Sequence, residues 1–503
     1  MKAATSIAMK PEVNQGLTLG PPFRFWREKF LLVAATSIAV VVPCFWHRRI
    51  EAGDLASHTY NAWLAQLIAH GQAPGLYLAH QWNNILLDVA LVRLGGIVGF
   101  GAAEKIVVPL CVLIFFWGAF ALITAATGRE PWFLVPAILM LAYGWTFQMG
   151  FLNYYLSLGL AFFSTALFWR GQRRQKLLGL ILAGLVLLAH PVGLLWAAGT
   201  VTYISLADRV QSRWRWPLFF AGLAAILATH FYVSHICRTY DPVLWHFYLF
   251  SGPDQFVVYG HRYRILAAAV LLLALGFVLS AFREWGKVDF QRRIRTPVEL
   301  WLLALFATAM VWGDIVMPKY ATGFTYLPMR LSTITAVLGL CVVGCLPLTK
   351  WHLAGLLGCG VVFFAWMYQD TAALNRMEEQ AENLVRGLPY GHRVVPSIWS
   401  PPGWRIGPEH VVDRACIGRC FVYSNYEPST RQFRMRVRPE GSPIVVSSPP
   451  TALAMSEGRY VVQSVDLPMV QIYQCDEKDL GRLCRRDLAA GEINGRLGYH
   501  PPN

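Results

Sequence analysis

Long apolar runs separated by short polar connections fill most of the chain up to residue 370. A helix needs about 20 apolar residues to cross the roughly 30 Å hydrocarbon core of a bilayer, and it satisfies its own backbone hydrogen bonds there. The pattern predicts an α-helical polytopic membrane protein with about eleven transmembrane helices. The predicted spans are 30–46, 104–127, 131–148, 150–169, 177–190, 192–207, 216–233, 265–282, 297–316, 330–347 and 351–369.

One further apolar stretch, 84–100, is short and carries Asp88 and Arg93 in its middle. Charges at the centre of a membrane are costly, so we place this stretch at the outer surface. With that placement, the loops rich in Lys and Arg fall on the cytoplasmic side, as the positive-inside rule expects. The number of spans is then odd, so residues 1–29 are predicted to be cytoplasmic and the C-terminal part to lie outside.

The composition changes after Asp370, where Pro, Gly and short β-rich runs replace the long apolar runs. This part contains four of the ten cysteines, and an even number in a polar region predicts disulfides and an oxidising compartment. Those four residues are Cys416, Cys420, Cys475 and Cys484. We therefore predict a transmembrane domain over 30–370 and a small extracytoplasmic α/β or β domain over 371–503, in a bacterial inner membrane.

Charge and composition support a membrane protein over a nucleic-acid-binding one. The 503 residues are 55% hydrophobic and only 15% charged, with a formal net charge of +15. Most of the basic residues flank apolar runs, where they act as cytoplasmic anchors. The predicted partners are accordingly membrane lipids, and no nucleic acid.

Candidate chemistry lies in the first outer loop, 47–103, which also holds two predicted juxtamembrane helices, 58–70 and 84–100. Asp54 precedes the first of these helices, where it would cap the helix N-terminus. It would alternatively act as a general base at the membrane surface, with His58 one turn later on the same helix face. The spacing alone leaves both interpretations open.

The order of these features resembles the GT-C superfamily of membrane glycosyltransferases, such as the lipid A aminoarabinose transferase and the protein O-mannosyltransferases. The loop contains an acidic residue, a surface helix, a Gly-x-x-Pro turn at 71–74 and a second surface helix before the next span. The resemblance is one of layout and covers residues 30–370. Three further motifs look similar: Met-Gly-Phe-Leu-Asn-Tyr at 149–154, His190-Pro191, and Leu-Pro-Met-Arg at 327–330.

The resemblance implies an inverting transferase that moves a sugar from a polyprenyl-phosphate donor to an envelope lipid, polysaccharide or protein on the extracytoplasmic side. In that family the first-loop acidic residue is usually catalytic, which implies that Asp54 is the general base. Many members carry two adjacent acidic residues, whereas here Leu55 follows Asp54. The leaving phosphate needs nearby cations. The candidate substrate-binding residues are Glu51, His58, His190, Arg262, Arg264, Lys319, Tyr320 and Arg330.

Other interpretations stay open from the sequence. A divalent metal is one, because loop 234–264 contains several His and Asp residues, but none has ligand spacing and we assign no metal ligand. A transporter or flippase of a lipid-linked glycan would place ionisable residues inside the spans, where few occur. A non-enzymatic scaffold for envelope polysaccharide assembly would bind through the tail and would tolerate loss of Asp54.

Overall fold

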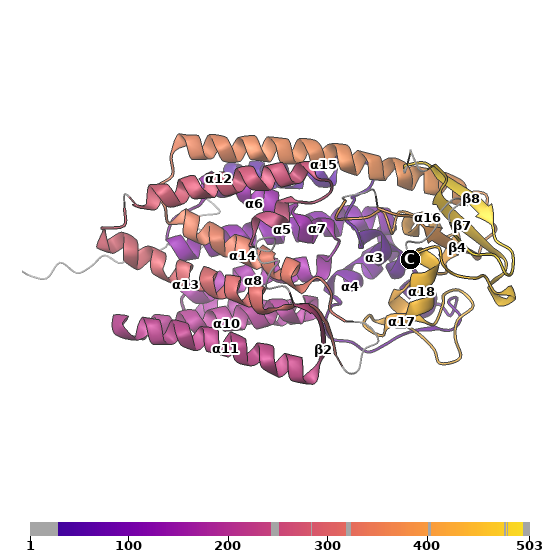
Figure 1. Ribbon diagram of the computed structural model, residues 1–503, viewed down its shortest axis with the longest axis horizontal. Helices are drawn as coiled ribbons and strands as arrows, with labels where there is room; N and C mark the ends of the chain where they lie inside the picture. The colour runs from indigo at the N-terminus through magenta and orange to yellow at the C-terminus, as the bar shows by residue number, and fades with distance from the viewer. Residues whose placement is uncertain are drawn as a thin grey trace, which may run out of the picture.

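The computed structural model describes residues 29–242, 251–282, 284–317, 323–400, 404–476, 479 and 481–495. The molecule is elongated, with a bundle of long helices at one end and a smaller domain of strands and short helices at the other (Figure 1). The bundle helices are α2 (Phe30–Val41), α5 (Phe100–Thr127), α6 (Val135–Ala142), α7 (Trp145–Gln148), α8 (Leu152–Arg170), α9 (Arg173–Ala189), α10 (Pro191–Ala207), α11 (Arg215–Ile236), α12 (Arg262–Phe282), α13 (Val288–Met310), α14 (Leu327–Gly344) and α15 (Lys350–Val385).

The chain is a predominantly helical membrane protein. Each predicted span overlaps one or more bundle helices. Within the described residues, five helical stretches are long and apolar enough to cross a membrane, and the crossing of the remaining segments stays a prediction. Those stretches are Phe100–Thr127, Ser212–Ile236, Arg262–Phe282, Leu327–Gly344 and Lys350–Val385.

One predicted span ends earlier than expected. The prediction of a helix over 297–316 is wrong for its last residues, because α13 stops at Met310. Residues Trp312–Val316 form strand β3, which pairs antiparallel with β2 (Arg238–Pro242) in a two-stranded ribbon. The β-branched Ile315 and Val316 suit a strand as well as an apolar helix end, so the apolar pattern alone misplaces the boundary.

Close packing of α5 on α8 forms the centre of the bundle. A Cβ added at Gly118 of α5 would lie 2.3 Å from the carbonyl oxygen of Gly159 in α8, so the two backbones meet where neither residue has a side chain. Next to this crossing, the rings of Phe115 and Tyr155 stack at 4.4 Å between centroids. Small residues at helix crossings are the usual means of close approach inside membranes.

Helices α9 and α10, which overlap the predicted spans 177–190 and 192–207, form a hairpin. Both pack on α8 and on each other. The chain reverses at His190, which has an extended backbone and whose ring nitrogen accepts a hydrogen bond from the N–H of Val192. Pro191 follows at the first helical position, where its missing N–H costs no helical hydrogen bond.

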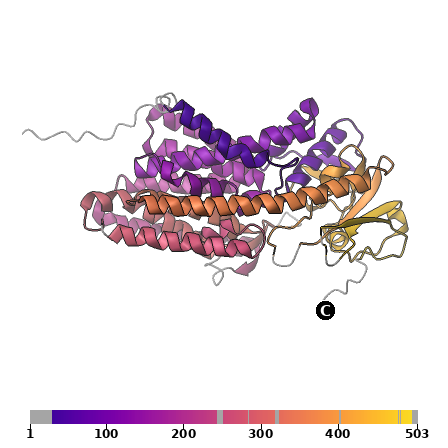
Figure 2. The same ribbon diagram turned by 90° about the horizontal axis from the view of Figure 1, so that it is seen from above.

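Helix α15 joins the bundle to the C-terminal domain without a break, as Figure 2 shows. The predicted span 351–369 is the first part of one helix of 36 residues, which continues to Val385. The predicted domain boundary at 371 therefore falls inside a rigid element, which fixes the position of the C-terminal domain relative to the bundle.

The C-terminal domain is built on a four-stranded mixed sheet in the order β5-β4-β7-β8. Strand β4 is parallel to β5 and β7, and β8 is antiparallel to β7. The predicted α/β character and the predicted disulfides are confirmed, with Cys416 bonded to Cys420 and Cys475 to Cys484. The elements are β4 (His392–Ser397), α16 (Asp413–Cys416), β5 (Cys420–Val422), α17 (Glu427–Thr430), β6 (Met435–Val437), α18 (Pro449–Ser456), β7 (Met469–Gln474) and β8 (Leu483–Asp487).

Helix α3 (Leu55–Ala69), which overlaps the predicted juxtamembrane helix 58–70, is largely enclosed by protein. Twelve of its fifteen residues are buried, because the C-terminal domain covers it. The ring of Trp63 stacks on Phe421, and the N–H of Val422 donates to the hydroxyl of Tyr60. Strand β1 (Leu76–Leu78) extends this contact by pairing with β6, whereas α4 (Leu86–Val98) leaves its C-terminal end exposed.

Candidate functional site

Asp54 is held where two turns of the backbone cross. Its N–H donates to the carbonyl oxygen of Met149 at 3.1 Å. A Cβ added at Gly53 would lie 2.4 Å from that oxygen, and one added at Gly150 would lie 2.3 Å from the nitrogen of Asp54. Both glycines also have positive φ angles. The crossing therefore requires glycine on both sides and places the 149–154 motif against Asp54.

The Asp54 side chain does not cap α3, although the residue occupies the N-cap position. Its carboxylate is about one quarter exposed and lies 3.6 Å from Nε2 of His410, in the loop before α16. Nδ1 of His410 bonds Asp413 at 2.9 Å. Burial opposes the charge on His410, but Asp413 and Asp54 raise its pKa to about 10. A cationic imidazolium thus lies between two carboxylates at neutral pH.

Arg330, in the first turn of α14, supplies a second cation to this site. Its guanidinium lies 3.7 Å from the ring centroid of Phe151 and interacts electrostatically with Asp54. The hydroxyl of Tyr154 donates to its carbonyl oxygen at 2.8 Å. Its Nε is buried and has no hydrogen-bond partner within the described residues. The predicted motifs 149–154 and 327–330 therefore meet, and they leave one donor of this cation available.

Tyr326 adopts a strained conformation beside this cation. Its backbone has a φ of +56°, in the left-handed region that few residues other than Gly or Asn adopt. The side chain is 45% exposed, and its ring contacts Trp145 and Phe151. Strain of this kind is concentrated at functional sites, where the surrounding structure enforces it.

A buried polar cluster lies beside Asp54 on the other side of α3. Nδ1 of His58 bonds Asp88 at 2.9 Å, and Asp88 accepts a second bond from Asn153 at 3.1 Å. Burial disfavours the charged form of His58, but Asp88 raises its pKa to about 9. Burial also raises the pKa of Glu427 to about 7, although the nearby His58 opposes this rise. His58 is thus a cation near the site, and Asp88 has a partner that the sequence did not reveal.

The remaining predicted residues lie in several places. His190 is buried and packs against the ring of Tyr154, so it supports the site from behind. Arg262 is tied to α15 through Asp370 at 2.6 Å. Arg264 is exposed. Lys319 and Tyr320 lie outside the described residues, and Glu51 joins a different group of charges.

That second group, called here the Arg414 cluster, contains Arg414, Glu51, Glu104 and Glu378. The guanidinium of Arg414 pairs with Glu378, bonds Glu104 at 2.9 Å and lies 3.9 Å from Glu51. Burial opposes the charge of Arg414, but the three carboxylates raise its pKa. Burial and the neighbouring Glu378 raise the pKa of Glu51 well above its ordinary value, which favours a protonated carboxyl.

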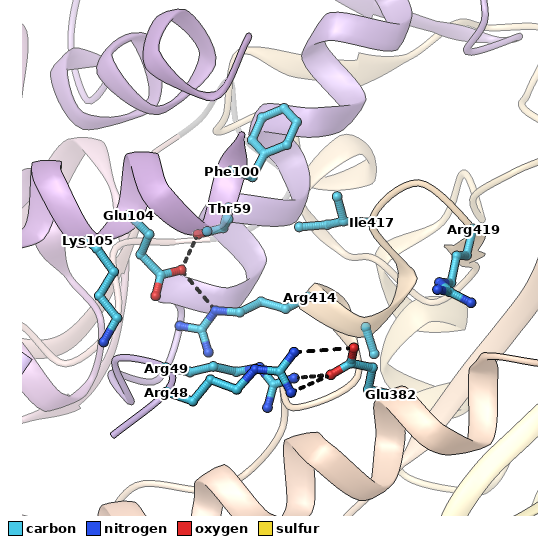
Figure 3. A pocket seen from close by; sticks show the side chains of 12 residues that line it. Arg48, Arg49, Thr59, Phe100, Glu104, Lys105, Glu382, Arg414, Ile417 and Arg419 are labelled. Atoms are coloured by element: carbon cyan, nitrogen blue, oxygen red, sulfur yellow. Dashed lines mark hydrogen bonds and ion pairs between the residues drawn. The ribbon is translucent and has the colours of Figure 1, made fainter. Parts of the chain in front are cut away.

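A cavity of about 430 Å³ opens beside the Arg414 cluster. Figure 3 shows Arg414 directed toward Glu104 and shows Arg48 and Arg49 directed toward Glu382. Residues of the first outer loop, α5, α15 and the C-terminal domain all contribute to its walls. Asp54 does not line this cavity.

The sequence reasoning missed the contributions of the C-terminal domain. His410, Arg414 and Glu427 reach the first outer loop directly. Asp413 acts there through its bond to His410. One local signal was present, because His410 and Asp413 are three residues apart and could meet on one turn. Nothing in the sequence indicates that this turn packs against Asp54.

Comparison with protein-family models, with curated proteins and with solved structures finds no match. Within the described part of the chain, no group of three or more His, Cys, Asp or Glu side chains is arranged to hold a metal ion. The chemistry available at the site is that of a part-exposed carboxylate facing two cations.

Proposed function

We propose that the chain is a membrane glycosyltransferase of the GT-C type, with eleven transmembrane helices, that takes a sugar from a polyprenyl-phosphate donor. One observation carries this proposal: the Asp54 carboxylate is part-exposed, is not used to cap its helix, lies 3.6 Å from the His410 cation and interacts electrostatically with Arg330. A sugar transfer of this kind needs a base for the acceptor hydroxyl and positive charge for the leaving phosphate.

The reaction assigns one role to each charge. Asp54 takes the proton of the acceptor hydroxyl, whose oxygen forms a bond to the anomeric carbon of the sugar. The bond from that carbon to the phosphate oxygen breaks, and the lipid phosphate leaves with the electron pair. Attack from the side opposite the phosphate inverts the anomeric carbon.

Arg330 is the best-placed cation for the phosphate. Its buried Nε lacks a protein partner within the described residues, and an unbonded buried donor is costly unless a ligand supplies the acceptor. Its stacking on Phe151 holds the guanidinium in place before the ligand arrives. His410 holds the Asp54 carboxylate in position and is itself held by Asp413.

The test is transfer of a radiolabelled hexose from a panel of polyprenyl-phosphate hexoses in membranes that contain the full chain. We expect Asp54→Asn to lower the rate by about 100-fold or more, the usual contribution of a general base. Asp208→Asn is the control, because Asp208 is an exposed acid at the C-terminal end of α10. Unchanged transfer by Asp54→Asn at normal expression would exclude the proposed role, and would favour the scaffold interpretation.

A further inference from the structure

The cavity beside the Arg414 cluster has an excess of positive charge. Five cationic and two anionic side chains line it. Three of the cations, Arg48, Arg49 and Arg414, are paired with carboxylates. Within the described residues, the other two form no ion pair: Lys105 donates to the carbonyl oxygens of Cys44 and His47, and Arg419 donates to that of Arg386. Neither side chain is bonded to a carboxylate of the described residues, although Glu104 and Glu51 interact electrostatically with Lys105.

The N-terminus of α5 adds to this positive potential. Phe100 and Gly101, in the first turn of this 28-residue helix, line the cavity. No side chain caps the helix, so its first N–H groups are available to an anion. A Cβ added at Gly99 or Gly101 meets nothing within 4 Å, so there is open space in front of the helix end.

Exposed apolar side chains surround this part of the molecule. Phe45, Ile97, Ile106 and Leu110 are between 44% and 78% exposed. Phe45 precedes Arg48 and Arg49 of the cavity wall, Ile106 and Leu110 lie on α5, and Ile97 lies on α4, which packs on α5. In a membrane, such side chains contact lipid chains. A ligand with an anionic head and an apolar tail would therefore pair with the cations of the cavity and also contact the apolar side chains around it. A free anion would interact with the cavity alone.

We propose that this cavity binds the phosphate headgroup of an anionic phospholipid, with the acyl chains along α4 and the first turns of α5. The headgroup accepts from Lys105, Arg419 and the N–H groups of the first turn of α5. The site is separate from Asp54, which does not line the cavity. Short helix α16 connects the two, since Asp413 faces His410 and the adjacent Arg414 faces the cavity.

The test measures the melting temperature of the purified full chain in detergent micelles as phosphatidylglycerol is added. Phosphatidylcholine and inorganic phosphate, at matched phosphorus concentrations, are the comparison additions. We expect phosphatidylglycerol to raise the melting temperature of the wild-type chain with a saturable dependence, and the other two additions to have little effect. An equal rise with inorganic phosphate would show a free-anion site, and an equal rise with phosphatidylcholine would exclude recognition of headgroup charge.

Gly101→Glu places a negative charge in the open space of the cavity. An acidic residue in a first helical turn stabilises the helix, so this variant should fold. We expect it to lose most of the response to phosphatidylglycerol. Gly286→Glu is the matched control, because Gly286 also has open space around it and lies in the α12–α13 connection, at the far end of the bundle from the C-terminal domain (Figure 1). An equal response in the two variants would overturn the proposal.

Arg419→Gln provides a second variant that does not depend on the folding of the first. The removed charge should raise the half-saturating concentration of phosphatidylglycerol about 5-fold, since one basic residue near an anionic lipid surface contributes about 1 kcal/mol. An unchanged half-saturating concentration would contradict the proposed site even if Gly101→Glu fails to fold. Because the measurement is lipid binding, it is independent of whether the chain transfers sugar.

Discussion

Two groups of charges lie on either side of α16, and they differ in how fully their charges are matched. The Arg414 cluster is buried, and each of its three carboxylates lies within 4 Å of the arginine, with Arg49 as a second cation beside Glu378. The site around Asp54 is part-exposed, and Arg330 keeps an unbonded Nε there among the described residues. A matched buried cluster is suited to hold two parts of a protein together, whereas unmatched charge is suited to bind a ligand.

The comparison also explains why consecutive residues of α16 serve different purposes. Asp413 fixes the His410 cation toward Asp54, and Arg414 anchors the C-terminal domain to α5 and α15. Because one short helix carries both residues, docking of the domain and assembly of the site depend on each other. The contrast between binding chemistry and anchoring can be tested by changing each group separately.

The largest expected effect on sugar transfer comes from changing Arg330, the second cation of the Asp54 site. Arg330→Gln removes the charge proposed to stabilise the leaving phosphate but keeps a side chain of similar length. We expect the transfer rate to fall by about 100- to 1000-fold, as for loss of one preorganised electrostatic group in an active site, with little change in melting temperature. Arg330→Lys restores the charge without the planar stacking on Phe151 and should recover part of the rate. Equal transfer rates for the Gln and Lys variants would show that the positive charge at position 330 does not contribute to sugar transfer.

Replacing Arg414, at the centre of the Arg414 cluster, should lower the stability of the protein. Arg414→Met leaves Glu104 buried without an ion-pair partner among the described residues and leaves Glu378 with Arg49 alone. Breaking a buried ion pair from one side costs about 3 to 5 kcal/mol. We expect the C-terminal domain to become sensitive to protease, as measured by limited digestion of the full chain. Arg459→Met is the control, because it removes an ion pair with Glu457 from an exposed arginine of the same domain, where the cost is below about 1 kcal/mol. Equal protease resistance of the two variants would refute an anchoring role.

The pH dependence of stability should reveal the His410 cation. Its pKa in the folded protein, about 10, exceeds the ordinary value of 6.5. A raised pKa stabilises the fold fully below pH 6.5, and this contribution is lost as the pH rises toward 10. The difference in melting temperature between the wild type and His410→Gln should therefore be largest near pH 6 and should close by about pH 10. A difference that stays constant over this range would mean that His410 is not the titrating group.

Much of the helical architecture could be predicted because its causes are local. Apolar runs and basic flanks determine where helices form in a membrane, and each predicted span overlaps bundle helices. The placement of α3 could not be predicted in the same way. Its apolar residues would suit a membrane surface equally well, but Trp63 and Tyr60 pack against the C-terminal domain, which is distant in sequence.

The candidate site also contains residues that could be predicted locally and residues that only distant contacts bring together. Asp54, His58 and Arg330 stand out by position, because each lies beside the outer end of a predicted span. His410 and Asp413 lie in a polar domain with many charges, and only the folded chain brings them to the first outer loop. Glu51 shows the opposite case: its position in the sequence resembles that of Asp54, but its side chain turns to Asn375 and the Arg414 cluster.

The smallest expected effect on sugar transfer comes from replacing one of the two disulfides, because only one of them lies beside α16. Cys416–Cys420 closes a short loop directly after α16, whereas Cys475–Cys484 joins β7 to β8. Loops this short predict a loss of about 2 to 3 kcal/mol when either bond is replaced by a pair of alanines. We expect both replacements to lower the melting temperature by similar amounts, but only the Cys416–Cys420 replacement to lower sugar transfer, by a few-fold, because α16 positions His410 and Asp413. An equal loss of transfer in both would mean that the Asp54 site responds to the stability of the whole domain and not to α16.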